Sequence, residues 1–432
     1  TSIITELILN PITKIALECP TAANVFAYIQ NHQLYSTDRA EAKTYADLFR
    51  FLNSGFAVLV LEGASSALVF GIQGYDKRSV SEPSGEDNVM GAKDGFIEVV
   101  RVNMSLLRRR MKTPQLKLEL FVKGTKSQTD LCLCYMADRV PKQLIREIKA
   151  RLDEMELESI LSSGYLQPFL ENRRSCLFDT VGTTQRPDVL CAKMLEGRVG
   201  LLIEGTPFAL VIPKLFCESF QTMDDYCYRP AYATLVRWIK YAAFLVAILL
   251  PALYVAIALH HPELLNRTLL LILAEAEENA PISLTAEAIG VLLVYEIIRE
   301  AGLRLPKAVG GAVSIVAGLI IGDAAVSSGL ISTPMLTVTA IAVIAGFVVP
   351  DLAQSITLLR LAFLLTAGVL GLFGISLLGA VVLFNLCAGE SFGFPITAPF
   401  APLYRKGFRD TLTRVSFRKM QSGNFTVEEY YE

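Results

Sequence analysis

The sequence is poor in the residues that bind metal ions and cross-link secreted folds. It has three histidines in 432 residues, and its eight cysteines are scattered without a CxxC pair or zinc-type spacing. Cys132 and Cys134 are same-face neighbours on an apparent strand. We therefore expect no metal site and no cofactor, and we expect reduced cysteines of the kind found in cytosolic domains.

Strong net charge and enzyme motifs are also missing. The formal net charge is -2 at pH 7, which gives no reason to expect nucleic-acid binding. We find no glycine-rich phosphate loop after a strand, no nucleophile elbow and no acid pair with a spaced histidine. The first twenty residues do not read as a secretory signal, although Thr1 is not a start methionine. The sequence therefore offers no residue on which to base an enzymatic function.

Hydrophobic residues are plentiful but unevenly spread. They make up 52% of the chain, and long apolar runs dominate residues 241–389, whereas residues 1–236 have ordinary globular composition. This asymmetry is typical of a soluble domain followed by a membrane domain. Arg237 and Lys240 precede the first long apolar run, so the positive charge predicts that the soluble domain lies on the cytosolic side.

Two stretches of the soluble half match each other. Residues 55–70 read GFAVLVLEGASSALVF and residues 197–212 read GRVGLLIEGTPFALVI, and they agree at seven positions without a gap. Each predicts a β-hairpin with a Glu-Gly turn that follows a helical stretch. Turn chemistry alone can produce such hairpins, but we favour a duplicated αβ unit. The matched carboxylates, Glu62 and Glu204, are expected to be exposed and far apart rather than a catalytic pair.

We therefore predict an α/β soluble N-terminal domain of two similar lobes followed by an all-α polytopic membrane domain. The membrane domain is expected to make about four to six crossings, with one candidate re-entrant element among them, and an even number if both ends are cytosolic. The expected segments are a helical segment at 1–44 with Tyr28, Ile29 and Tyr35 as packing anchors, lobes at 45–138 and 139–232, a transmembrane domain at 233–402, and a basic cytosolic tail at 403–432.

Three glutamates lie inside the apolar segment 281–306. Glu287 is near its start, Glu296 is roughly opposite it on a helix, and Glu300 is one turn beyond Glu296. Ionisable groups at membrane depth usually face a protein interior or a water-filled path, so we favour a functional role for Glu287. For the other two we favour pairing at the helix end with the arginines of the same segment, which are Arg299 and Arg304.

The remaining apolar segments suggest how the helices pack. Residues 264–274 are too short to cross and end in an acidic cluster, so we expect a hairpin or re-entrant element whose acidic turn is a pore mouth or a plain solvated loop. Residues 309–331 carry small residues at every fourth position, which predicts close helix packing. Residues 358–388 form one long tilted helix or two short ones broken near Gly371 to Gly374. The small residues are Gly310, Ser314, Gly318 and Gly322.

Polar residues near these spans are further candidates for a pore or gate. Asp323 follows the small-residue stretch and is a second candidate for a buried acid. Thr337 and Thr339 lie in the next span, 334–350, as weaker pore or helix-interface candidates.

Three motifs in this order resemble the GerA spore-germination family, A-subunit type. They are ENRRSCLFDTVGTTQRPDVLCAKMLEGRVGLLIEGTPFALVIP at 171–213, EIIREAGLRLPKAVGGAVSIVAGLIIGDAAVSSGLIS at 296–332 and SFGFPITAPFAPL at 391–403. The sequence departs from the family pattern at Pro281-Ile282-Ser283, where Pro-Phe-Pro is usual, and at Asp323, where glutamine is usual. The residues at family-motif positions are Arg186, Pro187, Asp188, Glu196, Gly197, Gly205, Glu287, Glu296, Arg299, Glu300, Gly302, Arg304 and Pro306.

The resemblance implies a multi-pass subunit of a nutrient-sensing receptor in the spore inner membrane. Such A subunits resemble channel-forming homo-oligomers that release monovalent cations, together with a transporter-like B subunit and a lipoprotein C subunit. An accessory sporulation channel of the same family and a non-conducting scaffold or binding subunit stay open as alternatives. The pore or gating candidates are Glu287, Asp323, Thr337 and Thr339, and the coupling or packing candidates are Glu296, Arg299, Glu300, Arg304, Gly318 and Gly322.

Overall fold

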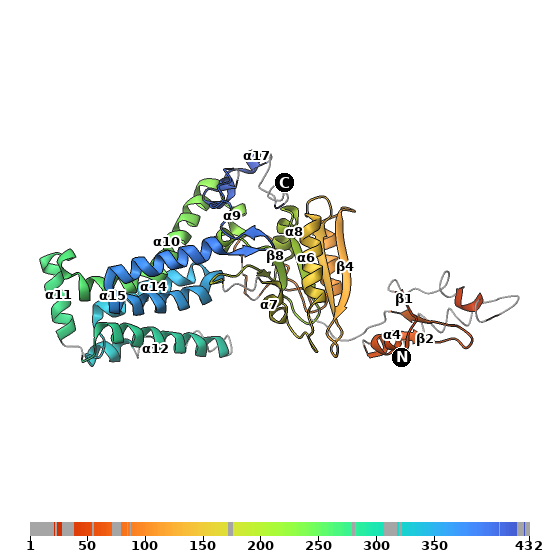
Figure 1. Ribbon diagram of the computed structural model, residues 1–432, viewed down its shortest axis with the longest axis horizontal. Helices are drawn as coiled ribbons and strands as arrows, with labels where there is room; N and C mark the ends of the chain where they lie inside the picture. Colours follow the sequence, from red (N-terminus) through yellow and green to blue (C-terminus); the bar gives the residue numbers. More distant parts are fainter. Residues whose placement is uncertain are drawn as a thin grey trace. The chain divides into compact units, whose positions relative to one another are not determined.

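The chain forms two compact units, Thr1–Ser79 and Val80–Glu432, in the computed structural model (Figure 1). The structure describes residues 21, 24–27, 39–53, 56–70, 79–83, 85–86, 88–171, 176–278, 281–305, 318, 322–405, 407–420 and 427. Of the residues named above, Tyr28, Ile29, Tyr35, Pro306, Gly310 and Ser314 lie outside this part of the chain.

The first unit is a small antiparallel sheet covered by helical segments. The strand order is β1-β3-β2, and helix α4 connects β1 to β2. Leu48 and Phe51 of α4 pack on one face of the sheet, while the helical residues 24–27 pack on the other through Val25 and Phe26. The bounds are β1 Arg39–Ala42, α4 Tyr45–Asn53, β2 Ala57–Leu59 and β3 Ala67–Phe70.

The second unit begins with a five-stranded antiparallel sheet of order β4-β5-β7-β8-β6. Alternate side chains point to opposite faces of a strand, so the sheet has two apolar faces. Helix α6 covers one face and helices α5 and α8 cover the other. The bounds are α5 Val100–Arg110, β4 Leu116–Lys123, β5 Thr129–Met136, α6 Lys142–Asp153, α7 Gln167–Leu170, β6 Gly182–Thr184, α8 Pro187–Leu195, β7 Val199–Ile203 and β8 Ala209–Ile212.

The predicted repeat is present and is larger than the sequence match. The segments α4 and α8 begin 142 residues apart, as do β2 and β7, and β3 and β8. The hairpin register is the same in both, because Ala57 pairs with Phe70 as Val199 pairs with Ile212. Strands β1 and β6 also correspond, since both pair antiparallel with the last strand of their hairpin. The repeated unit is therefore strand, helix, strand, strand.

The lobe boundaries differ from the prediction of 45–138 and 139–232. Strand β5 pairs with β7, so the strands expected in the first lobe complete the sheet of the second, and the chain divides after Ser79. The sequence match marks the repeated element but cannot show which sheet the intervening strands join, because strand pairing is non-local.

The helical part of the second unit is a bundle in which α10, α12, α14 and α15 contact one another, with α11 at its far end (Figure 1). Pro230–His260 and Pro350–Ala388 are long and apolar enough to cross a membrane, and Thr333–Phe347 is a shorter apolar helix. The chain thus has an α/β N-terminal region and a mostly helical C-terminal part. The bounds are α10 Pro230–His260, α11 Arg267–Glu278, α12 Leu284–Arg304, α14 Thr333–Phe347 and α15 Ala353–Ala388.

Helix α15 contains the break that the sequence suggested. Gly371 has φ +60° and ψ -143°, which lie outside the helical region, so two helical segments meet there at a kink. The side chain of His260 packs against Gly371, and its Nε2 is 3.0 Å from the carbonyl oxygen of Gly368. A Cβ at Gly371 would lie 2.9 Å from that of His260, so the kink and the end of α10 fit only around a glycine.

The helical part ends earlier than the predicted boundary at residue 402. After Ala388 the chain returns to the α/β region, where Phe392, Phe394 and Ala398 are buried in the same core as α6. The C-terminal tail also contacts the α/β region, since the amide of Val427 donates to the carbonyl oxygen of Glu196. The sequence motif SFGFPITAPF is therefore a core element of the α/β region. The remaining bounds are α9 Asp224–Cys227, β9 Glu390–Ser391, β10 Phe394–Pro395, α16 Phe408–Thr411 and α17 Phe417–Met420.

Candidate functional site

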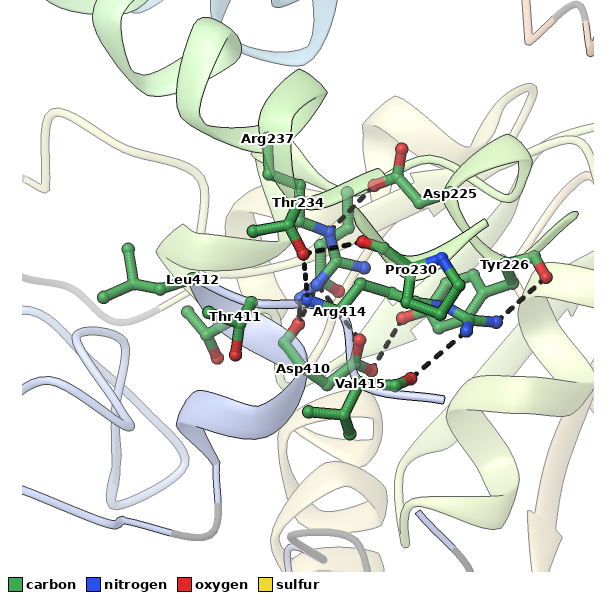
Figure 2. A network of polar contacts seen from close by, with 12 residues as sticks. Asp225, Tyr226, Pro230, Thr234, Arg237, Asp410, Thr411, Leu412, Arg414 and Val415 are labelled. Atoms are coloured by element: carbon green, nitrogen blue, oxygen red, sulfur yellow. Dashed lines mark hydrogen bonds and ion pairs between the residues drawn. The ribbon is translucent and has the colours of Figure 1, made fainter. Parts of the chain in front are cut away.

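Charged side chains join the helical bundle to the α/β region at the base of α10. Arg237 is fully buried, and its Nε donates to Asp225 Oδ2 at 3.0 Å (Figure 2). Its Nη1 lies 3.0 Å from Asp410 Oδ1 in the returning C-terminal segment. Lys240, one helical turn later, lies 3.4 Å from Asp225 Oδ1. Arg237 therefore connects α10 both to the short segment that precedes it and to the C-terminal segment, 173 residues later.

Aromatic and basic side chains hold the C-terminal segment against this base. The Tyr226 hydroxyl donates to Asp410 Oδ2 at 2.8 Å, and burial together with Asp410 raises the pKa of Tyr226 well above its usual value. Arg414 is buried, donates to the Tyr226 carbonyl oxygen at 3.0 Å and lies over the ring of Phe417. The indole of Trp238 donates to the Leu412 carbonyl oxygen at 3.0 Å. We name these contacts, together with the ion pairs of Arg237 and Lys240, the base network.

A second buried cluster lies between the turn after α8 and the segment that leads to α10. Lys193 Nζ is 2.8 Å from Glu218 Oε1, and Arg198 pairs with the same carboxylate. Arg198 Nη2 is 3.4 Å from Glu196 Oε2. Burial raises the pKa of Glu218, but Arg198 and Lys193 outweigh this effect and lower it to about 2. Glu218 is therefore ionised at neutral pH.

The motif residues around α8 have structural roles. The guanidinium of Arg186 pairs with Asp188, with Nη2 2.7 Å from Oδ2, and Pro187 opens the helix. Gly197 has φ +86°, and a Cβ there would lie 2.7 Å from the carbonyl oxygen of Arg139. These residues fix the turn that carries Arg198 into the buried cluster.

Sequence reasoning found two members of the base network but assigned them another role. Arg237 and Lys240 were interpreted as the positive charge that places the start of the first span on the cytosolic side, and the structure shows them buried and paired. Asp225, Asp410 and Glu218 were missed, because acidic partners in a mostly polar segment give no periodic signal. One signal was available: Asp224 and Asp225 stand shortly before Arg237 and Lys240 in the sequence, and such opposite charges can pair.

The predicted pairs at the end of α12 are present. Arg299 Nη2 lies 2.6 Å from Glu296 Oε2, and Arg304 Nη2 lies 2.6 Å from Glu300 Oε1. Glu296 makes a further contact that the sequence did not indicate, since its Oε1 is 3.0 Å from Nη2 of the buried Arg360 in α15. Glu296 thus connects α12 to α15, whereas Glu300 binds only within its helix among the described contacts.

We expect Glu296→Gln to destabilise the protein by about 3 kcal/mol, because it leaves Arg360 buried beside an uncharged amide. Glu300→Gln is the matched control and should cost under about 1 kcal/mol, since its pair with Arg304 is exposed. Thermal unfolding in detergent measures both. Equal effects of the two substitutions would show that Glu296 contributes no helix-to-helix ion pair.

Glu287 is buried, as the sequence predicted, at the contact between α12 and α14. Its Oε1 accepts the backbone amide of Ser332 at 2.7 Å and the Ser332 hydroxyl at 2.8 Å. Ser332 is the N-cap of α14, where a carboxylate interacts favourably with the helix dipole. The other oxygen, Oε2, is buried and has no hydrogen-bond partner among the described residues.

The other pore candidates divide by exposure. Thr339 is buried, and its hydroxyl has no partner in the described part of the chain, whereas Thr337 is exposed and donates to the Thr333 carbonyl oxygen. Asp323 is exposed in the single chain, so the one chain does not supply the burial expected for this acid. An apolar flank does not bury an acid unless another helix packs over it.

The small-residue candidates do not pack closely within the described chain. A Cβ added at Gly318 would meet no described atom within 4 Å, and one at Gly322 would meet only Leu336 at 3.9 Å. Small-residue spacing permits close helix approach but does not supply the neighbouring helix.

Comparison with known proteins identifies the family. The sequence-family model described as Bacillus/Clostridium GerA spore germination protein matches residues 1–424 of this chain. Spore germination protein KA of Bacillus subtilis is 38% identical over 376 residues, which cover 86% of this chain and 69% of that protein. The uncharacterized membrane protein YfkQ of Bacillus subtilis is 37% identical over 368 residues, covering 85% of this chain and 72% of that protein.

A solved structure is also similar in sequence. It is the N-terminal domain of the A subunit of the Bacillus megaterium spore germinant receptor GerK3, at 38% identity, covering 28% of this chain and 97% of that chain with a TM-score of 0.24. The family match extends over nearly all of the sequence, and it includes the motifs on which the α8 turn and the Glu296 pair depend. The chain therefore belongs to the GerA family of spore germination proteins.

Proposed function

We propose that the protein is a membrane subunit of a spore germinant receptor, and that several copies form a nutrient-gated channel for monovalent cations. The observation that carries the proposal is Glu287, a carboxylate buried in the helical bundle with one oxygen unpartnered among the described residues. Such a group is costly in an apolar bundle and usually serves a path for ions or protons. A transporter-like B subunit and a lipoprotein C subunit are the proposed partners.

We propose different roles for the four candidates on the basis of their exposure. Asp323 and Thr337 are exposed in one chain and are the residues that an axis between copies can use. Glu287 and Thr339 are buried between helices, so they set the position of α14 and act as the gate. Return of the chain from α15 to the α/β core supports an even number of crossings, with the α/β region on the cytosolic side of the spore inner membrane.

The base network supports coupling between the α/β region and the helices. Arg237 contacts both α9 and the returning C-terminal segment, so a displacement of the α/β region acts directly on α10. Glu296 and Arg360 extend the connection from α15 to α12. The soluble region would in this way set the gate in response to nutrient binding elsewhere in the receptor.

We expect Glu287→Gln to lower potassium flux through liposomes that contain the purified protein by about tenfold or more, because it removes the charge at the N-terminus of α14. Glu300→Gln is the control of equal charge change at an exposed position and should leave the flux unchanged. The elution volume in detergent and the fluorescence of the single tryptophan check that both variants are folded.

Two outcomes would contradict the proposal in different ways. Unchanged flux and ion selectivity in folded Glu287→Gln would remove the role of Glu287. Absence of flux through the unaltered protein, together with tight binding of a small molecule, would favour a scaffold or binding subunit instead of a channel.

A further inference from the structure

The first unit has an apolar surface on the outer face of α4 and beside β2. Tyr45, Phe49 and Leu52 follow one another at helical spacing and are 81%, 59% and 46% exposed. Val60, directly after β2, is 65% exposed. Contiguous apolar surface of this kind on a soluble unit is typical of a contact with another protein. We name these four residues the α4 surface.

The internal repeat shows what covers the corresponding surface elsewhere in the chain. The counterparts of Phe49, Leu52 and Val60, each 142 residues later, are Cys191, Met194 and Leu202, and all three are buried. They pack with Val100, Leu106 and Leu107 of helix α5 in one apolar cluster. In the second unit, helix α5, which contacts α8, β5 and β7, therefore covers this face.

The strand edges differ between the repeats in the same way. Strand β7 pairs with β5, whereas in the described part of the first unit nothing pairs with the outer edge of its counterpart, β2. Such an edge presents unpaired backbone groups to which another strand can add. The α4 surface and this edge lie where the second unit has α5 and β5, so one helix and strand pair would cover both.

Strand β4 is an edge with matching properties. It is the outer strand of the five-stranded sheet, and Leu116 and Leu118 pack with α5. Leu120 points to the same face by the alternation of a strand and is 45% exposed. On the opposite face Glu119 is held by Lys149 and Tyr135, so its charge is satisfied within the same domain. Each edge therefore has one exposed apolar residue on the corresponding face: Val60 on the α4 face of the first sheet and Leu120 on the α5 face of the second.

We propose that a second copy of this chain covers the α4 surface by pairing its β4 edge with β2, so that its α5 lies beside α4. Each copy then offers one edge of each kind, and the contact is heterologous. Contacts of this type generate closed rings when the rotation between copies closes. The inference rests on the proposed homo-oligomer and names the surfaces that join its soluble regions.

The test uses two differently tagged full-length chains, one with Val60→Cys and the other with Leu120→Cys, co-expressed in the same membrane and treated with a short bismaleimide. Cys227 and Cys387 are exposed, so both are replaced by serine in all samples. When the two chains are co-expressed, we expect a covalent dimer that carries both tags. When either variant is expressed alone, we expect no covalent dimer. Phe49→Glu should reduce the dimer, whereas Lys43→Glu, at an exposed position outside the α4 surface, should not.

Several results would overturn this arrangement. A dimer from the Val60→Cys chain alone would show a symmetric contact between copies. Cross-linking only within a chain that carries both cysteines would show a contact inside one chain. No cross-link in any sample would show that something other than the β4 edge covers the α4 surface. Potassium flux on the same samples separates this inference from the channel proposal. Flux without the cross-link removes only the β2–β4 contact, and the cross-link without flux removes only conduction.

Discussion

Asp225→Asn is expected to release the C-terminal segment from α10 and to lower the stability of the protein by about 3–5 kcal/mol. The carboxylate of Asp225 is almost fully buried and contacts two cations, Arg237 and Lys240. Asparagine keeps the size of the side chain but removes the charge. Lys240 would lose its carboxylate partner, and Arg237, which also holds Asp410 of the C-terminal segment, would lose one of its two. A buried ion without its partner costs several kcal/mol, which makes this one of the two largest effects we expect.

Trp238 provides a direct measurement of this release. It is the single tryptophan of the chain, and its indole donates to the Leu412 carbonyl oxygen in the C-terminal segment. Loss of the segment should change its emission maximum and its accessibility to a soluble quencher. Asp224→Asn is the control, since the neighbouring carboxylate accepts the backbone amides of Val89 and Met90 instead. If both variants left the emission and the melting temperature unchanged, the base network would not hold the segment.

Glu218→Gln is expected to have an effect of similar size, together with a changed pH dependence. It leaves Lys193 and Arg198 without their shared carboxylate, which should cost about 3–5 kcal/mol at neutral pH. In the unaltered protein burial raises the pKa of Glu218, but the two cations outweigh it and bring the pKa to about 2, below its value in an unfolded chain. A carboxyl of this kind stabilises the fold above the unfolded pKa, and this contribution is lost as the pH falls toward 2.

The pH experiment therefore has a defined direction. Between about pH 6 and pH 3 the unaltered protein should lose roughly 2 kcal/mol through this group, and Glu218→Gln should not show that part of the loss. Chemical unfolding in detergent at several pH values measures it, and the difference between the two proteins removes the contribution of other carboxyls. A parallel decline in both proteins would mean that Glu218 is not held in its ionised form by Lys193 and Arg198.

The membrane candidates illustrate how far local sequence can specify a site. The pairs Glu296–Arg299 and Glu300–Arg304 follow from helical spacing, and both were predicted. The contact of Glu296 with Arg360 was not, because it joins residues 64 positions apart on different helices. The burial of Glu287 was predicted from depth, but its bond to Ser332 depends on the position of α14.

The two-part architecture, the family, both hairpins of the repeat and the helical segments with their local ion pairs could all be predicted from the amino-acid sequence. These features depend on composition, periodicity and short-range spacing, which a single chain displays directly. Three features became visible only in the folded chain: β5 pairs with β7, the motif after α15 belongs to the α/β core, and Arg237 is buried between Asp225 and Asp410. The physical reason is that strand pairing and the burial of charge depend on contacts between segments far apart in the chain, and a local sequence pattern does not indicate which distant segments will be in contact.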